Sequence, residues 1–199
     1  MKLEDGTGNS FLARVDGQNH LHTRAVRIPE NLYASLKAEL FGCSIGAVNL
    51  TNAAESAVLY LKCEDQDNPL VITHLNYYFS PSTGGSATVP VFFRMLRNIS
   101  GGTILTGGTD WTLANYNFSS SIAPQATLIK GAQGLTASGG SVVVQNAIGA
   151  GYGASDVSPG IVLPNGSSMT ILVTPPTGNT SMDVYVCARF MSVKLSDVL

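Results

Sequence analysis

The sequence predicts an all-β protein, an antiparallel jelly roll or β-sandwich of about eight strands with an extended N-terminal arm and one short helix. Three observations lead to this prediction. Apolar and polar residues alternate in runs after residue 42, clusters of turn-forming residues separate these runs, and one stretch alone has a helical period. Short alternating runs at this spacing are typical of two packed antiparallel sheets.

The predicted strands are rich in Val, Ile, Leu and aromatic residues, which favour a pleated, half-buried backbone. They cover residues 43–51, 55–62, 69–79, 88–97, 126–131, 141–148, 167–174 and 182–194. Clusters of Gly, Pro, Asn and Ser lie between them, as at residues 80–85 and 175–179. We expect the core of this domain, residues 42–199, to include Val58, Leu59, Leu61, Val71, Ile72, Phe92, Val143, Ile171, Val173, Val184 and Val186.

The predicted helix covers residues 29–41. Leu32, Tyr33, Leu36 and Leu40 recur at helical spacing and would lie on one face. Pro29 suits the start of a helix and Gly42 suits its end. One apolar stripe leaves open whether the helix packs on its own domain or on a neighbouring copy.

Residues 1–28 are predicted to form an extended arm. Asp5-Gly6 and Asp16-Gly17 are turn signals that separate short alternating pieces. The segment has too few large apolar residues to offset the cost of ordering its backbone, about 1 to 2 kcal/mol per residue. We therefore expect the arm to become ordered against a partner.

Two long connections interrupt the strands. Residues 98–125 carry the aromatic residues Trp111, Tyr116 and Phe118, which we take as an interface loop, and residues 147–160 form a second Gly-rich excursion. Sandwich folds place such excursions at the ends of the strands, where they meet partners.

Charge is sparse in this chain. Charged residues make up 12% of the sequence and the net charge is −2, while an average protein has roughly 25% charged residues. The basic residues are scattered, which argues against nucleic acid as a partner. No apolar run reaches the ~18 residues of a membrane helix and the N-terminus is not signal-like, so we expect a soluble protein made in the cytoplasm, with no membrane partner. Burial of part of the surface against other copies explains such a low charge better than solvation does. We therefore expect a homo-oligomer, and specifically a homotrimer.

The usual catalytic and ligand-binding patterns are incomplete. The Gly-rich residues 149–153 are not followed by the helical period that a nucleotide-binding loop requires. His20 and His22 would share one face of a strand, but no spaced cluster of further metal ligands accompanies them. A Ser-His-Asp triad is also hard to assemble, because the chain has many Ser but only three His. We therefore expect no catalytic residues, no metal and no cofactor, and we predict that the protein is not an enzyme.

Two further groups of residues have ordinary structural interpretations. Glu64, Asp65 and Asp67 form an acidic turn without the spacing of a calcium loop, and we expect it to be a solvated loop. Cys43, Cys63 and Cys187 lie in apolar runs, and we expect them to be buried, reduced thiols.

Several segments resemble a known family. Glu4-Asp5-Gly6-Thr7-Gly8, Ala13-Arg14-Val15-Asp16 and Leu21-His22-Thr23-Arg24-Ala25-Val26 are similar to the N-terminal arm of tailed-bacteriophage virion structural proteins of the capsid decoration or cement-like kind. The resemblance continues in residues 55–62, 163–168 and 175–181 but does not cover residues 98–160. It implies attachment to a phage particle, hence location in the virion, and it supplies no catalytic residues.

Two virion roles agree with this resemblance. As a capsid decoration or cement protein, the chain would clamp neighbouring subunits of the major capsid protein, as a trimer at three-fold positions. As a neck or tail-fibre component, it would hold its arm in the particle and present its sandwich to solvent or to host glycan. The short chain without extended repeats favours decoration. A sugar-binding module outside a virion is the rival interpretation, through the aromatic residues Trp111, Tyr116 and Tyr152.

The arm would attach most economically by adding a strand to an exposed sheet edge, because backbone hydrogen bonds then supply much of the affinity. In this hypothesis the apolar anchors are Phe11, Leu12, Val15 and Leu21. Arg14 and Arg24 would pair with acidic groups of the receiving surface.

Overall fold

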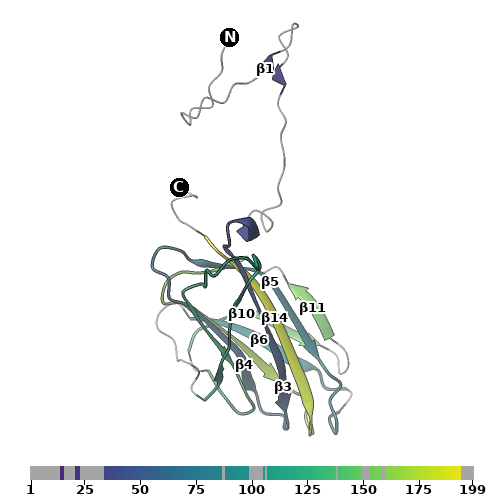
Figure 1. Cartoon of the computed structure of the whole chain (residues 1–199). Helices are drawn as coiled ribbons and strands as arrows, with labels where there is room; N and C mark the ends of the chain where they lie inside the picture. Colours follow the sequence, from purple (N-terminus) through teal and green to yellow (C-terminus); the bar gives the residue numbers. More distant parts are fainter. Residues whose placement is uncertain are drawn as a thin grey trace.

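The structure is a computed structural model, and it describes residues 14–15, 21–22, 34–86, 88–98, 105, 107–137, 139–148, 153–157 and 160–193. In this part of the chain, two antiparallel sheets pack face to face (Figure 1). The all-β sandwich predicted from the sequence is confirmed.

The first sheet has its strands in the order β10-β6-β13-β4-β9-β7 within the described residues, and we call it the β10–β7 sheet. Every neighbouring pair in it is antiparallel. Its strands are β10 (Ser141–Ile148), β6 (Val91–Asn98), β13 (Ser168–Thr174), β4 (Ser56–Cys63), β9 (Ala126–Lys130) and β7 (Thr109–Asp110).

The second sheet has the order β11-β5-β14-β3-β8, and we call it the β11–β8 sheet. The short strand β12 also pairs with β5, beyond the end of β11. The strands are β11 (Gly153–Val157), β5 (Leu70–Phe79), β14 (Met182–Ser192), β3 (Leu40–Leu50), β8 (Ala114–Asn115) and β12 (Ile161–Leu163). Each of the eight predicted runs overlaps one of the longer strands of the two sheets. The short strands β7, β8, β11 and β12 were not predicted.

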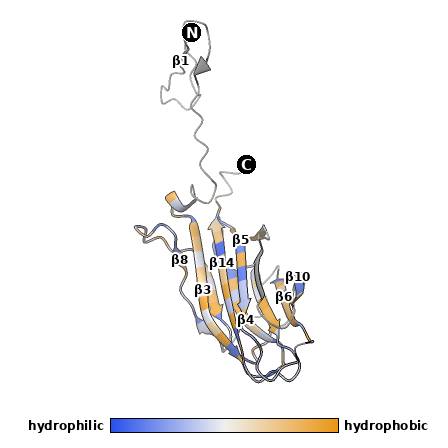
Figure 2. Cartoon of the chain, turned by 90° about the vertical axis from the view of Figure 1, so that its right-hand side faces the viewer, coloured by the Kyte–Doolittle hydropathy of each residue, from blue (hydrophilic) through white to orange (hydrophobic). Residues whose placement is uncertain are grey.

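The main core lies between the sheets. Alternate residues of β14 and β5 turn inward, and both strands alternate between hydrophobic and hydrophilic colours in Figure 2. Tyr77 of β5 stacks on Phe93 of β6 with ring centroids 4.1 Å apart, and its hydroxyl accepts a 3.0 Å hydrogen bond from Asn146 Nδ2 of β10. Aromatic stacking and a satisfied hydroxyl thus join the two sheets in the interior.

Most of the predicted core is buried as expected, with three corrections. Val58, Leu59, Leu61, Ile72, Ile171, Val173, Val184 and Val186 are buried, whereas Val71 is half-buried and Phe92 and Val143 are exposed. Phe92 is exposed because adjacent residues of a strand point to opposite faces of the sheet, and its neighbour Phe93 points into the core. Val143 lies in a β-bulge of an edge strand, where the register shifts between Val142 and Val144.

A second apolar cluster covers the outer face of the β10–β7 sheet. Tyr60 and its neighbours are buried there beneath the connections on either side of β9, and the members of the cluster are Ala57, Tyr60, Leu96, Leu105, Ile129 and Leu172. Part of the predicted excursion is therefore a cover for this sheet.

The predicted helix at residues 29–41 needs a correction. Within the described residues, only 34–36 are helical, and a turn at 37–38 with Ala38 at φ 61° leads into β3 at Leu40. Residues 29–33 lie outside the described part. Leu40 and Phe41 adopt strand conformation because they pair with Met191 and Phe190 of β14, and such tertiary pairing overrides a local helical pattern.

In the segment predicted as an arm, β1 (Arg14–Val15) and β2 (Leu21–His22) pair antiparallel, in a two-stranded sheet separate from the sandwich. These strands flank the predicted turn at Asp16-Gly17. The other residues of the predicted arm, including Phe11, Leu12 and Arg24, lie outside the described residues.

Candidate functional site

One end of the sandwich carries both the first and the last described residues of its two sheets. A small buried apolar cluster forms there from Ala34, Leu40 and Met191, with Val193 packed against it. The Ser192 N–H donates to the carbonyl of Glu39 over 2.9 Å. We call this region, formed by residues 34–41, 64–69 and 192–193, the terminal end (upper part of the sandwich in Figure 1).

Part of the excursion over residues 107–125, from residue 114 to 122, lies along the terminal end and is held there by hydrogen bonds. β8 pairs with the start of β3, and the Tyr116 N–H donates to the carbonyl of Leu40 over 3.0 Å. The side-chain amide of Asn115 donates to the carbonyls of Ala38 and Ile122 over 2.9 and 3.0 Å. One asparagine therefore joins the excursion to the turn that precedes β3.

Tyr116 packs against β3 at a glycine. A Cβ added to Gly42 would lie 2.6 Å from Tyr116 Cε2 and 3.1 Å from the carbonyl oxygen of Ala188. The guanidinium of Arg189 lies 5.8 Å from the centre of the Tyr116 ring, within the range of a cation–π contact. Gly42, predicted as a helix stop, therefore has another role, because it makes room for this ring.

Trp111 is also held against the sandwich. Its backbone N–H donates to the carbonyl of Leu128 over 3.0 Å, and the ammonium of Lys130 lies 5.1 Å from the centre of its indole ring. Trp111 and Tyr116 are thus anchors of the excursion, and each has contacts within its own chain.

Phe118 differs from these two residues because its side chain is 94% exposed. Leu36 and Ile122 are 64% and 57% exposed. The three belong to connected segments, since Asn117 Nδ2 reaches the Leu36 carbonyl at 3.5 Å and Asn115 bonds to the Ile122 carbonyl. We call Leu36, Phe118 and Ile122 the terminal apolar patch. Large apolar side chains this exposed in one region are typical of an interaction surface.

An apolar hollow of about 260 Å³ lies on one side of the excursion, beside the terminal apolar patch. Tyr116, Phe118 and Cys187 are among its lining residues. Cys187 is half-buried, while Cys43 and Cys63 are buried, and all three thiols are free. Burial raises the pKa of Cys43 to about 11 and also raises the pKa of Cys63, so both thiols stay protonated and unreactive at neutral pH.

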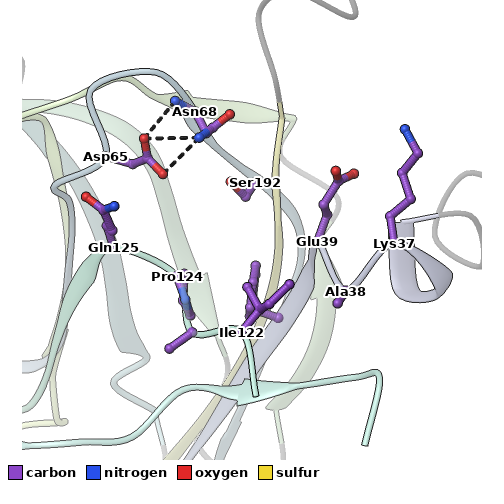
Figure 3. Close-up of a pocket in the computed structure, with 11 residues that line it drawn as sticks. Lys37, Ala38, Glu39, Asp65, Asn68, Ile122, Pro124, Gln125 and Ser192 are labelled. Atoms are coloured by element: carbon purple, nitrogen blue, oxygen red, sulfur yellow. Dashed lines mark hydrogen bonds between the residues drawn. The ribbon is translucent and has the colours of Figure 1, made fainter. Parts of the chain in front are cut away.

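A second hollow, of about 280 Å³, lies between residues 37–39, the acidic turn and residues 122–125, and Ile122 is among its lining residues (Figure 3). Lys37, Glu39 and Asp65 contribute its charged side chains. Asp65 Oδ1 accepts hydrogen bonds of 3.0 Å from the N–H groups of Asp67 and Asn68, and both carboxylate oxygens accept from the Asn68 amide. The acidic turn is thus organised around its own backbone.

The pKa of Asp65 reflects this arrangement. Partial burial raises the pKa, but the hydrogen bonds from the Asn68 side chain and from the backbone of Asp67 and Asn68 together outweigh that effect and hold the pKa below its usual value. The carboxylate is therefore ionised at neutral pH and stabilises the turn.

Among the residues that the structure describes, no group of three or more His, Cys, Asp or Glu side chains is placed to hold a metal ion. No helix in the same residues has the length and apolar character needed to cross a membrane.

The structure brings together only part of the predicted site. Tyr116 and Phe118 lie at the terminal end, and Trp111 lies beside β9. Arg14, Val15 and Leu21 lie in the separate β1–β2 ribbon. Sequence reasoning placed Leu36 on the apolar face of the predicted helix but not among the interface residues. It did not single out Ile122, because a single apolar residue in a connection gives no signal of exposure.

Protein-family models and curated proteins give no match to this chain. Two solved structures are similar at a low level, namely T=1 particles derived from infectious bursal virus and a mutant VP2 protein of infectious bursal disease virus. They are 12% and 13% identical to the chain, with TM-scores of 0.14 and 0.12. The matches cover 79% of this chain but only 38% and 39% of those chains. TM-scores this low show neither a shared fold nor a shared function.

Proposed function

We propose that this chain is a non-enzymatic structural protein of a phage particle, a capsid decoration or cement protein that clamps neighbouring subunits of the major capsid protein as a homotrimer. Its place is the virion, and it is made in the host cytoplasm. The proposal rests on the resemblance of its N-terminal residues to phage virion proteins and on the layout of the terminal end.

The observation that carries the proposal is the position of the terminal apolar patch. Leu36, Phe118 and Ile122 are exposed at the end where the chain enters the sandwich, directly after the segment predicted to attach to a partner. Burial of such side chains on a capsid surface would remove apolar area from water at about 25 cal/mol per Å². Attachment through one end would leave the rest of the sandwich outside the contact.

A second role has one observation in its favour. On the outer face of the β11–β8 sheet, Tyr78 and Tyr185 are cross-strand partners with ring centroids 5.8 Å apart, and Tyr185 is half-exposed. A half-exposed aromatic ring can stack on a sugar ring. The alternative is therefore a neck or tail-fibre component whose sandwich binds host glycan.

Binding of the purified chain to particles that lack it separates the two roles. We expect the double variant Phe118→Ser/Ile122→Ser to bind roughly tenfold more weakly or worse, as the loss of one well-buried anchor implies. Tyr185→Ser should bind normally. Val162→Ser is the matched control. It removes an exposed valine from β12, which lies at the edge of the β11–β8 sheet away from β8.

The opposite pattern would overturn the decoration proposal. If Phe118→Ser/Ile122→Ser binds like the unaltered chain, the terminal end is not the attachment surface. If Tyr185→Ser alone abolishes binding to host glycan while particle binding persists, the fibre role is supported.

A further inference from the structure

The strand β10 forms an open edge of the sandwich. Within the described residues it is the last strand of the β10–β7 sheet and pairs only with β6. It extends over Ser141–Ile148, whereas the other edge strands of the two sheets, β7, β8, β11 and β12, have two to five residues each.

The composition of β10 is unusual for an edge. Its residues, SVVVQNAI, include no charge and no proline. Val142 and Val143 are 46% and 42% exposed. Soluble proteins protect edge strands with lysine, proline, bulges or short length, because the free N–H and C=O groups otherwise pair with other chains. β10 has one of these devices, the bulge between Val142 and Val144.

A candidate partner for this edge is present in the chain itself. β1 and β2 pair only with each other among the described residues, in a two-stranded sheet. A two-stranded sheet is marginally stable by itself in water, and a third strand stabilises it. Among the residues that the structure describes, no further strand pairs with the β1–β2 ribbon, and one side of β10 has no strand beside it.

The ribbon can extend beyond its own sandwich. The link over residues 23–33 spans at most about 40 Å when fully extended, which exceeds the ~30 Å diameter of a small domain. The absence of charge on β10 means that no like-charge repulsion opposes a second copy at this edge.

We propose that the N-terminal segment of one copy, residues 1–33, adds to β10 of a neighbouring copy, so that the β1–β2 ribbon extends the β10–β7 sheet. This inference rests on the homotrimer of the proposed function, and it names the contact that joins one copy to the next. Donor and acceptor surfaces differ, so the contact is head-to-tail, and three such contacts close a ring. The terminal apolar patches of the three copies then act together on the capsid, and their combined binding exceeds that of one copy.

The test uses sedimentation velocity, with circular dichroism to verify folding. The unaltered chain should sediment as a trimer of the 20.8 kDa chain. Deletion of residues 1–27 removes the donor and none of the buried core residues, and it should give a monomer. Val142→Lys/Val143→Lys charges the acceptor edge and should also give a monomer. Val162→Lys, which alters a valine of 45% exposure on the short strand β12, is the matched control and should stay trimeric.

Mixing the two defective variants gives the sharpest result. The deletion variant keeps an intact edge, and Val142→Lys/Val143→Lys keeps an intact arm, so one of each should form a 1:1 dimer that cannot close into a ring. A monomeric unaltered chain would overturn the inference, as would a deletion variant that remains trimeric or a mixture that stays monomeric. Capsid decoration by an unaltered monomer would refute the arm exchange and the homotrimer but not the decoration role. A trimer that never binds particles would refute the decoration role but not the arm exchange.

Discussion

The ring of Tyr116 lies against the backbone of Gly42, so close that a Cβ at residue 42 would lie 2.6 Å from Tyr116 Cε2. The ring belongs to the excursion over residues 107–125 and the glycine belongs to β3. This contact links the excursion to the sandwich beside the terminal apolar patch.

The first prediction is that Gly42→Ala destabilises the protein by about 1–3 kcal/mol, the usual cost of forcing a methyl group into a packed site. Gly46→Ala is the matched control in the same strand, since its Cβ would meet only Lys130 Nζ, at 3.7 Å. Urea unfolding measures both. Equal stability of the two variants would show that the Tyr116 ring moves aside at little cost.

The second prediction concerns Asn179, a buried polar side chain that joins three segments. Its Nδ2 donates to the carbonyls of Leu50 and Asn52 over 2.8 and 3.1 Å, and its Oδ1 accepts from Ser82 Oγ over 2.6 Å. Asn179→Ala should lower the free energy of unfolding by about 1–3 kcal/mol, because buried partners lose their hydrogen bonds. Thermal unfolding of Asn165→Ala, at an exposed turn position, should show a negligible change.

The third prediction is that Cys187 reacts first with a thiol reagent. It is half-buried and lines the apolar hollow, whereas the raised pKa values of the buried Cys43 and Cys63 keep them as thiols. Iodoacetamide at pH 8, followed by mass spectrometry, should modify Cys187 in the native protein and the other two only in denaturant. Native labelling of Cys187→Ser at the rate of the unaltered chain would contradict this assignment.

The fourth prediction concerns pH. The folded-state pKa of Asp65 is lowered, so its contribution to stability is present above the unfolded-state value of about 3.9 and is lost as the pH falls through the lower folded-state value. Asp65→Ala should cost about 1 kcal/mol near neutral pH through its lost hydrogen bonds. In urea unfolding at several pH values, the difference from the unaltered chain should shrink below pH 4. Asp67→Ala is the matched control and should cost less near neutral pH, because this carboxylate accepts none of these bonds.

Local patterns were sufficient for the longer strands but not for the short ones. β10 was predicted at its observed bounds, because turn residues precede an apolar run at Ser141. β7 and β8 have two residues each and exist through pairing with β9 and β3, which are distant in sequence. No local pattern carries that information.

The phase of a strand and the role of an aromatic residue also depend on distant contacts. Phe92 and Phe93 are equally apolar, and only pairing with β13 shows which one faces the core. Trp111, Tyr116 and Phe118 look alike in sequence, yet Phe118 alone has a nearly fully exposed side chain. Of the terminal apolar patch, sequence patterns therefore identified Phe118 as an interface residue and Leu36 only as part of a helical apolar face, and they did not single out Ile122.

An electron-microscopy map of the intact particle decides whether the chain decorates a capsid through its terminal end. We expect density for the sandwich on the outer capsid surface at three-fold positions, with Leu36, Phe118 and Ile122 turned toward the major capsid protein. Density for the sandwich at the neck or tail, or on the capsid with the terminal end facing solvent, would rule out attachment to the capsid through this end.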